Sequence, residues 1–388
     1  MTAPRLEIDL TRIAHNARSL TSRLAHRGIE VTGATKAALG SPELGLALVG
    51  AGVLTLGDSR IENLERLRRA DVPATLALLR SPMLSQLDRV VRHADLSFNT
   101  EPEVVAGLSA AARDQATTHG VVLMVELGDL REGILPADLA DAVREILRQP
   151  NLTLEGLGTN LACRSGIVPD AAKMADLSAL VTAIEATFGI QLPIVTGGNS
   201  ANLGWALGDE PVGRINDLRL GESLLLGLDP LDRRPIDGLH ADAISLVAEV
   251  IESKIKPSLP WGRTAQTAFG ATGAPTDRGL VAQTLLALGE QDVDPLGLTA
   301  PEGTGIAATS SDHLVLISAE RFDIGTQLRF VPNYSALLRA MTSPFVTKQF
   351  VTSNHAAQQV LDPLTVLASD HHGHRECIIV SGHRGPRP

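Results

Sequence analysis

Eight short apolar runs lie between residues 31 and 222, and most are separated by stretches with helical spacing of apolar residues. Each run ends in polar or small residues; the runs are VTGATK, VLTLGDS, ATLALL, ADLSFN, VVLMVEL, LEGLGTN, IVTGGN and DLRLGE. The helical stretches include IENLERLRRAD, PEVVAGLSAAARD, LADAVREILRQ and AAKMADLSALVTAIEATFG. Such alternation predicts an α/β fold with a parallel sheet, and eight strands predict a TIM-type (β/α)8 barrel. An open doubly wound sheet is the alternative, although no GxGxxG motif indicates its dinucleotide-binding version.

The pattern changes after about residue 238. Strand-like runs separated by Gly/Pro-rich turns follow, and no long helical pattern appears before YSALLRAM. The turn-rich stretch GLDPLDRRPIDG precedes the change. We therefore expect the barrel to occupy residues 11–237 and a C-terminal, mainly β domain to occupy residues 238–350. A length of 388 residues also favours two domains over one.

Composition argues against several classes of protein. The 34 Lys and Arg residues against 44 Asp and Glu give a net charge of −10, which argues against a general nucleic-acid-binding or membrane-binding surface. Two cysteines form no disulfide framework, so a reducing compartment is expected. The N-terminus MTAPRLEIDL lacks a secretory pattern, and the apolar stretch LGLALVGAGVLTLG is too short and glycine-rich to span a membrane. We expect a soluble, cytoplasmic protein.

Residues 351–388 end in the polar sequence SGHRGPRP, and we expect this extension to be partly disordered. It contains three neighbouring histidines, His371, His372 and His374. No carboxylate or cysteine accompanies them at a recognised metal-ligand spacing, so a solvated tail is favoured over a metal site. We expect no bound metal.

Polar residues follow the predicted strands at their C-terminal ends, where (β/α)8 barrels carry their functional residues. They are Lys36, Asp58, Asn99, Asn160, Asn199 and Arg219. A lysine at such a position can form an imine with a carbonyl compound, although most strand-end lysines are simply solvated. The stretch IVTGGNSANL offers glycines, Asn199 and Ser200 after a strand. These residues suit a phosphate group or an ordinary turn, and alone they leave both open.

Three stretches carry a resemblance to a known family: LEIDLTRIAHNARSL, VTGATK and GDSRIENLERL. Together they resemble the fold-type III pyridoxal-phosphate enzymes, the alanine racemase superfamily, and most closely its ornithine/alanine racemase-like branch. The resemblance extends over roughly residues 5–350. It implies that Lys36 carries pyridoxal 5'-phosphate as a Schiff base and acts as the first catalytic base. It also implies that the first strand, within residues 1–10, belongs to the β domain.

The resemblance also implies which residues hold the cofactor. Ser200 matches a phosphate-binding serine, and Arg219 matches an arginine that faces the pyridine nitrogen. Asn160 lies where alanine racemases have a histidine beside the ring. The full set implied for the cofactor is Lys36, Asn160, Asn199, Ser200, Arg219, Gly221, Glu222 and Tyr334.

For the substrate, the resemblance implies contacts from Arg131, Ser311 and Asp312. The second catalytic base is not assigned, because by the resemblance Phe269 matches the position where alanine racemases have a tyrosine from the partner subunit. The candidates to replace that tyrosine are Cys163, Asp312, His313 and Tyr334. Racemisation by two bases needs one proton acceptor on each face of the α-carbon.

The implied activity is interconversion of L- and D-amino acids by removal and return of the α-proton in a homodimer with active sites shared across the interface. The stretches GDSRIENL, GDLREGI, GGNSANL, QDVDP and SSDHL favour ornithine or another basic or broad-range substrate, with alanine also open. One alternative is a pyridoxal-phosphate carrier, which lacks a β domain. The other alternative is a fold-type III decarboxylase or aldolase. Arg219 argues against a decarboxylase, and no metal site supports an aldolase.

Overall fold

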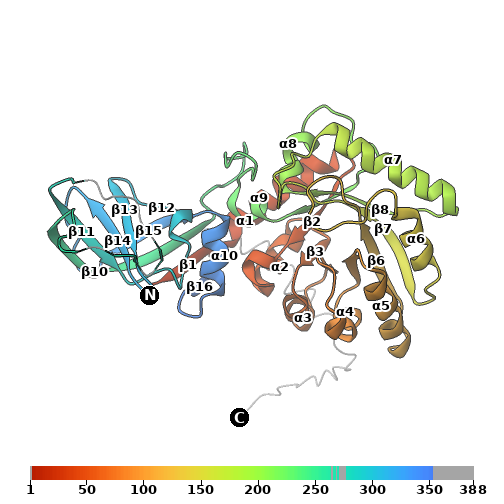
Figure 1. Ribbon diagram of the computed structural model, residues 1–388, viewed down its shortest axis with the longest axis horizontal. Helices are drawn as coiled ribbons and strands as arrows, with labels where there is room; N and C mark the ends of the chain where they lie inside the picture. The colour runs from red at the N-terminus through yellow and green to blue at the C-terminus, as the bar shows by residue number, and fades with distance from the viewer. Residues whose placement is uncertain (1, 264, 268, 271–276, 353–388) are drawn as a thin grey trace, which may run out of the picture.

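The computed structural model describes residues 2–263, 265–267, 269–270 and 277–352. These residues form a barrel and a separate β-sheet domain, which lie at opposite ends of the molecule (Figure 1). The predicted fold class is therefore confirmed. Nearly all of the predicted C-terminal extension, including His371, His372 and His374, lies outside the described residues. None of the helices in the described part of the chain has the length and apolarity that a membrane crossing requires.

Eight parallel strands close the barrel in sequence order. They are β2 (Glu30–Ala34), β3 (Thr55–Asp58), β4 (Thr75–Leu78), β5 (Leu96–Asn99), β6 (His119–Met124), β7 (Leu152–Gly158), β8 (Ile194–Asn199) and β9 (Asp217–Leu220). Closure comes from pairing of β2 with β9, with Val31 opposite Leu218. Most residues of these strands are buried, and all six residues of β6 are. Burial on both faces explains why the runs are nearly continuously apolar rather than alternating.

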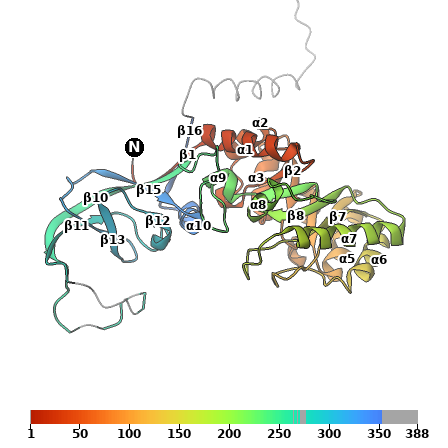
Figure 2. The same cartoon turned by 90° about the horizontal axis from the view of Figure 1, so that it is seen from above.

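The helices between the strands surround the barrel (Figure 2). They are α1 (Leu10–Ala25), α2 (Pro42–Gly50), α3 (Ile61–Arg69), α4 (Leu87–His93), α5 (Pro102–Asp114), α6 (Leu139–Leu147), α7 (Ala171–Phe188), α8 (Leu203–Ala206) and α9 (Glu222–Leu226). Asp9 ends strand β1 (Arg5–Asp9) and also caps α1, because its carboxylate accepts hydrogen bonds from the backbone N–H groups of Thr11 and Arg12. The chain therefore passes from the β-sheet domain into the barrel without a loop.

The β-sheet domain has the strand order β12-β15-β10-β11-β14-β13, and β1 pairs antiparallel with β10 and parallel with β16. The bounds are β10 (Ile244–Pro257), β11 (Leu280–Leu286), β12 (Leu298–Thr299), β13 (Thr304–Thr309), β14 (Leu314–Ser318), β15 (Gln327–Pro332) and β16 (Thr347–Val351). Helix α10 (Tyr334–Thr342) follows β15 and packs against the short 3-10 turn Lys36–Ala38 of the barrel. This contact brings the second domain to the end of β2.

The pairing of β1 predicts a strong dependence of stability on its buried side chains. Leu6 is fully buried where β1 lies between β10 and β16. Leu6→Ala leaves a cavity that the sheet cannot close, so we expect the free energy of unfolding to fall by about 3 kcal/mol. Urea denaturation followed by circular dichroism measures it. The matched control is Leu296→Ala, because Leu296 is 96% exposed. Equal stabilities of the two variants would contradict the prediction.

Candidate active site

Lys36 begins the turn that follows β2, and its side chain is exposed at the C-terminal end of the barrel. The preceding residue, Thr35, fixes this turn. Its N–H donates to the carbonyl oxygen of Gly57 at 2.8 Å, and its hydroxyl donates to a carboxylate oxygen of Asp58 at 2.8 Å. The Lys36 Nζ atom lies 5.9 Å from the centroid of the Tyr334 ring. The second domain thus contributes Tyr334 to the surroundings of the lysine.

Asp58 is completely buried and anchors the lysine turn to β3. It accepts further hydrogen bonds from the Arg60 N–H at 2.9 Å and from the Asn63 side-chain amide at 3.0 Å. Burial raises the pKa of the Asp58 carboxyl, and the hydrogen bonds from Asn63 and Thr35 oppose that rise. Because its acceptor positions are taken by the protein, Asp58 has a structural role beneath Lys36.

A second turn follows β8. Asn199 and Asn202 cap it reciprocally, and Gly198 has a φ of +149°, where a Cβ atom would lie only 2.1 Å from Asn202 Oδ1. The buried Ser200 hydroxyl lies 2.9 Å from that of Ser223 and accepts hydrogen bonds from the N–H groups of Gly221, at 3.2 Å, and Ser223, at 3.3 Å. Ser200 therefore joins the ends of β8 and β9. A hydroxyl beside backbone N–H groups is suited to bind a phosphate.

Arg219 on β9 points into the barrel and is buried. Its guanidinium donates hydrogen bonds to the Thr159 carbonyl oxygen at 2.7 Å and to the Asn160 side-chain oxygen at 3.3 Å, and it also bonds the Thr196 hydroxyl. Burial lowers the pKa of Arg219, and Asp217 on the same strand opposes that shift. A guanidinium nonetheless remains charged in a protein. The site therefore contains a fixed cation.

Asn160 and Asn199 connect β7 to β8. The Asn199 side-chain amide donates to Asn160 Oδ1 at 3.1 Å, to the Leu161 carbonyl oxygen at 2.8 Å and to Cys163 Sγ at 3.5 Å. Asn160 Nδ2 is buried and has no hydrogen-bond partner in the described protein. A buried donor without a partner is rare, so this atom indicates a position where a bound group can accept a hydrogen bond.

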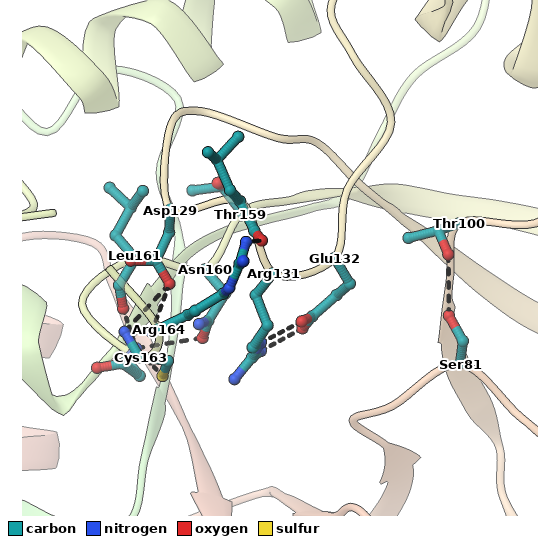
Figure 3. Close-up of polar contacts among 12 residues, drawn as sticks. Ser81, Thr100, Asp129, Arg131, Glu132, Thr159, Asn160, Leu161, Cys163 and Arg164 are labelled. Carbon is teal, nitrogen blue, oxygen red and sulfur yellow. Dashed lines mark hydrogen bonds and ion pairs between the residues drawn. The ribbon is translucent and has the colours of Figure 1, made fainter. Parts of the chain in front are cut away.

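Asp129 ties together the loops that follow β6 and β7. Figure 3 shows its contacts with the segment that begins at Cys163. The fully buried carboxylate accepts hydrogen bonds from the N–H groups of Cys163 at 3.2 Å, Arg164 at 2.9 Å and Ser165 at 3.0 Å. Burial alone would raise the pKa of Asp129, but these backbone donors hold it below the ordinary value. Arg131, two residues further on, forms a bidentate ion pair with Glu132.

Tyr334 and Glu222 complete the surroundings of Lys36. Burial raises the pKa of the Tyr334 phenol, and the nearby Glu222 carboxylate raises it further. Burial also raises the pKa of Glu222, whereas its ion pair with Arg233 and the nearby Lys36 lower it. Tyr334 is therefore a protonated hydrogen-bond donor at neutral pH.

The structure does not bring all of the predicted residues together. Ser311, Asp312 and His313 form the turn between β13 and β14, where the Asp312 carboxylate lies 2.9 Å from His313 Nδ1. Their recorded hydrogen bonds are to one another and to other residues of the β-sheet domain. Phe269 belongs to the segment between β10 and β11 and is 56% exposed. Cys163 and Tyr334, in contrast, lie at the same barrel end as Lys36.

Sequence reasoning missed the side chains that support the site. Asp129 and Glu132 lie in the stretch GDLREGI, of which only Arg131 was predicted to belong to the site. The buried Thr159 and Thr196 hold Arg219, but single threonines inside strands carry no distinctive signal. An acidic residue directly after a glycine and two positions before Arg131 is the one signal that could have identified Asp129.

A (β/α)8 barrel with a lysine at the end of its first strand, followed by a mostly antiparallel β-sheet domain, defines the fold-type III class of pyridoxal-phosphate enzymes. The sequence profile described as "Alanine racemase, N-terminal domain" matches residues 8–229. The chain therefore belongs to the alanine racemase superfamily, and it is a pyridoxal 5'-phosphate-dependent amino-acid racemase, an isomerase.

Named relatives match nearly the whole chain. A lysine racemase of Thermotoga maritima is 39% identical over 91% of this chain and 100% of its own length. An ornithine racemase of Acetoanaerobium sticklandii is 33% identical over 90% of this chain and 99% of its own length. Among solved structures, an alanine racemase of Clostridium difficile covers 92% of this chain and 97% of its own, with a TM-score of 0.72 and 18% identity. That likeness supports the fold alone.

The residues at the barrel end fit pyridoxal 5'-phosphate. Lys36 provides an exposed amine, and the Ser200 turn provides a hydroxyl next to backbone N–H groups. Arg219 provides a fixed cation that is hydrogen-bonded to the end of β7. The unpartnered Asn160 Nδ2 atom adds a hydrogen-bond donor. Within the described ranges, no group of three or more His, Cys, Asp and Glu side chains is arranged to hold a metal ion.

The Asp129 contacts predict a pH-dependent contribution to stability. Because its folded-state pKa is depressed, the contribution is complete above the unfolded pKa of about 4 and is lost as the pH falls through the folded pKa. Asp129→Asn removes a charged acceptor, so we expect the free energy of unfolding at pH 7 to fall by about 2 kcal/mol. Denaturant titrations should show the difference from wild type shrinking below about pH 4.

The matched control is Asp141→Asn at the start of α6, because the Asp141 side chain is 81% exposed. We expect a change of at most about 0.5 kcal/mol there. A difference between wild type and Asp129→Asn that grows at low pH would contradict the assigned direction of the pKa shift.

Proposed function

We propose that this enzyme racemises a basic amino acid, lysine or ornithine, and that it works as a homodimer. The observation that carries the proposal is the near full-length similarity to a lysine racemase and an ornithine racemase. The β-sheet domain is included in that similarity, which argues against a carrier built on the barrel alone. Alanine is less well supported as substrate, because the curated alanine racemases match 59% of this chain or less.

Lys36 is the proposed attachment point for the cofactor and the base on one face of the substrate. When bound, pyridoxal 5'-phosphate supplies an electron sink that stabilises negative charge at the substrate α-carbon. The turn held by Thr35 and Asp58 presents the lysine amine at the barrel end, while its long side chain stays free to move a proton.

The remaining cofactor contacts come from the ends of β7, β8 and β9 and from α10. Ser200, Gly221 and Tyr334 are proposed to hold the phosphate, since they supply two hydroxyls and a backbone N–H. Asn199 fixes the turn that presents Ser200, and Glu222 begins the helix after Gly221. Arg219 is proposed to face the pyridine nitrogen and to leave it unprotonated, because a guanidinium cannot release its proton. An unprotonated pyridine ring is a weaker electron sink, which favours simple return of the proton to the α-carbon. Asn160 Nδ2, at the end of β7, is proposed to orient the ring.

Arg131 is proposed to bind the substrate α-carboxylate. A planar guanidinium binds carboxylates in a bidentate manner, and Arg131 already makes that geometry with Glu132. Arg131 lies on the loop after β6. Asp129 holds this loop beside Cys163, close to the hydrogen-bonded side chains of Asn160 and Asn199. The α-carboxylate would therefore lie on the β6–β7 side of the barrel end, away from the Ser200 turn.

The second base remains one of four residues. Tyr334 suits this role poorly, because burial raises its pKa and because it lies beside Lys36. Cys163 lies at the same barrel end in the same chain. Asp312 and His313 reach a barrel end only if a second copy supplies them, and they form a hydrogen-bonded acid–base pair. We propose Asp312 and His313, together with the substrate contact of Ser311, as the partner's contribution.

Replacement of Lys36 tests the catalytic proposal. We expect Lys36→Ala to lower α-proton exchange of L-lysine and L-ornithine by about 10³-fold or more, because both the attachment point and a base are lost. Proton NMR in D2O with chiral chromatography measures exchange and configuration. Borohydride reduction followed by mass spectrometry measures covalent cofactor. Lys254→Ala, at an exposed site in the β-sheet domain, is the control. If the wild-type enzyme exchanges the α-proton of neither L-lysine nor L-ornithine, the proposed substrate class is refuted.

A mixed dimer tests the shared site. We expect Lys36→Ala and the Asp312→Ala/His313→Ala double variant each to be inactive alone. Coexpressed chains should recover about a quarter of wild-type activity, because half of the dimers then contain one intact site of two. Full activity of the double variant would exclude Asp312 and His313 and leave Cys163 and Tyr334, which Cys163→Ala then distinguishes. Inactive mixed dimers would show that the sites are not shared.

A further inference from the structure

We infer that Glu132 binds the distal ammonium group of a diamino-acid substrate and so determines the specificity of the enzyme for basic amino acids. This inference rests on the proposed function and concerns the same site. A basic amino acid carries a second ammonium that must keep a charged or hydrogen-bonding partner when it leaves water. A carboxylate at the barrel end must therefore pair with the distal ammonium.

Most carboxylates around the barrel end already have structural partners. The two buried aspartates at this end accept hydrogen bonds from the surrounding protein: Asp58 from Thr35 and Asn63, and Asp129 from three backbone N–H groups. Glu222 is paired with Arg233 next to the Ser200 turn, on the proposed phosphate side. Binding a substrate through any of them would break contacts that hold the fold.

Glu132 differs because its recorded partner in the described part of the chain is Arg131 alone. The two side chains are 29% and 37% exposed, so they lie at the mouth of the site and not in the core. An ion pair that is open to solvent is weak and can exchange partners. Glu132 is therefore a carboxylate that a substrate can recruit without disturbing the structure.

The loop holds Glu132 in a fixed place. The Glu126 N–H donates to the Ile134 carbonyl oxygen at 2.9 Å, and the Ile134 N–H donates to the Met124 carbonyl oxygen at 2.8 Å. Gly133 has a φ of +158°, and a Cβ atom there would lie 2.4 Å from the Glu126 nitrogen. These hydrogen bonds join the two ends of the loop close to Glu132. The Glu132 backbone is therefore held in position before the substrate binds.

The Arg131–Glu132 pair matches a basic amino acid in the sign of its charges. When Arg131 binds the α-carboxylate, Glu132 loses its cation and becomes available to the distal ammonium. The exchange replaces one ion pair with two, and the charge balance at the mouth is unchanged. An amino acid with a neutral side chain would instead leave Glu132 without a partner, which disfavours its binding.

The test compares two substrates with the same carbon skeleton in wild type and Glu132→Gln. L-Norleucine has the carbon skeleton of L-lysine but a hydrogen in place of the distal ammonium. We expect Glu132→Gln to lower kcat/KM for L-lysine by about 10- to 100-fold, mainly through KM, while kcat/KM for L-norleucine stays equal or rises. Glu145→Gln removes a carboxylate on α6 that is paired with Arg148, and it should leave both values unchanged.

A binding measurement without chemistry supports the same comparison. 5-Aminopentanoate carries a carboxylate and a distal ammonium but no α-amino group, and pentanoate lacks both amines. By calorimetry with the holoenzyme, wild type should prefer 5-aminopentanoate, and Glu132→Gln should lose that preference.

Equal losses for lysine and norleucine would mean that Glu132 acts only by positioning Arg131, and the inference would be overturned. Unchanged values for both would overturn it as well. If the wild-type enzyme racemises neither L-lysine nor L-ornithine, the proposed function fails. Calorimetry with 5-aminopentanoate and pentanoate then still tests whether Glu132 binds an ammonium group.

Discussion

Closure of the barrel between β2 and β9 is the constraint on which the active site depends. Backbone pairing places Thr32 opposite Arg219, and the pairing of β8 with β9 places Asn199 opposite Arg219. With this register, the lysine turn after β2 and the Ser200 turn after β8 meet on either side of β9. Side chains alternate along a strand, so a slip of one residue would turn Arg219 out of the barrel. The chemistry of the site therefore depends on strand register.

Within the closed barrel, hydrogen bonds hold two charged groups, the buried Arg219 and the half-buried Asp217. Arg219 is surrounded by the Thr196 hydroxyl, the Thr159 carbonyl oxygen and the Asn160 side chain. Asp217 accepts from the Thr32 hydroxyl at 2.7 Å, and burial raises its pKa. Burial of a charge is unfavourable unless hydrogen bonds replace its water, and here they do. Since the surrounding groups are rigid, Arg219 has a fixed orientation, as electrostatic control of a cofactor requires.

Local patterns explain what the sequence could predict. The strand runs, the exposed Lys36 and the Ser200 turn are encoded by residues near one another in the chain, and parallel strands necessarily bring their ends together. Asp129 could not be assigned in this way, because its partners lie on the next loop, after β7. The position of Asp312 could not be predicted either. It depends on the fold of the β-sheet domain, and its proposed catalytic contact depends on a second copy of the chain.

The two arginines of the site illustrate how burial separates roles that sequence cannot. Arg219 is 6% exposed, and its hydrogen bonds are to groups of the barrel wall, so it cannot leave them for a substrate. Arg131 is exposed and bound to the adjacent Glu132, so under the proposed binding mode the α-carboxylate of the substrate replaces that contact. A racemase must bind and release two mirror-image amino acids through the same groups. Under the proposed function, the permanent Arg219 cation faces the cofactor, and the exchangeable Arg131–Glu132 ion pair binds and releases the substrate.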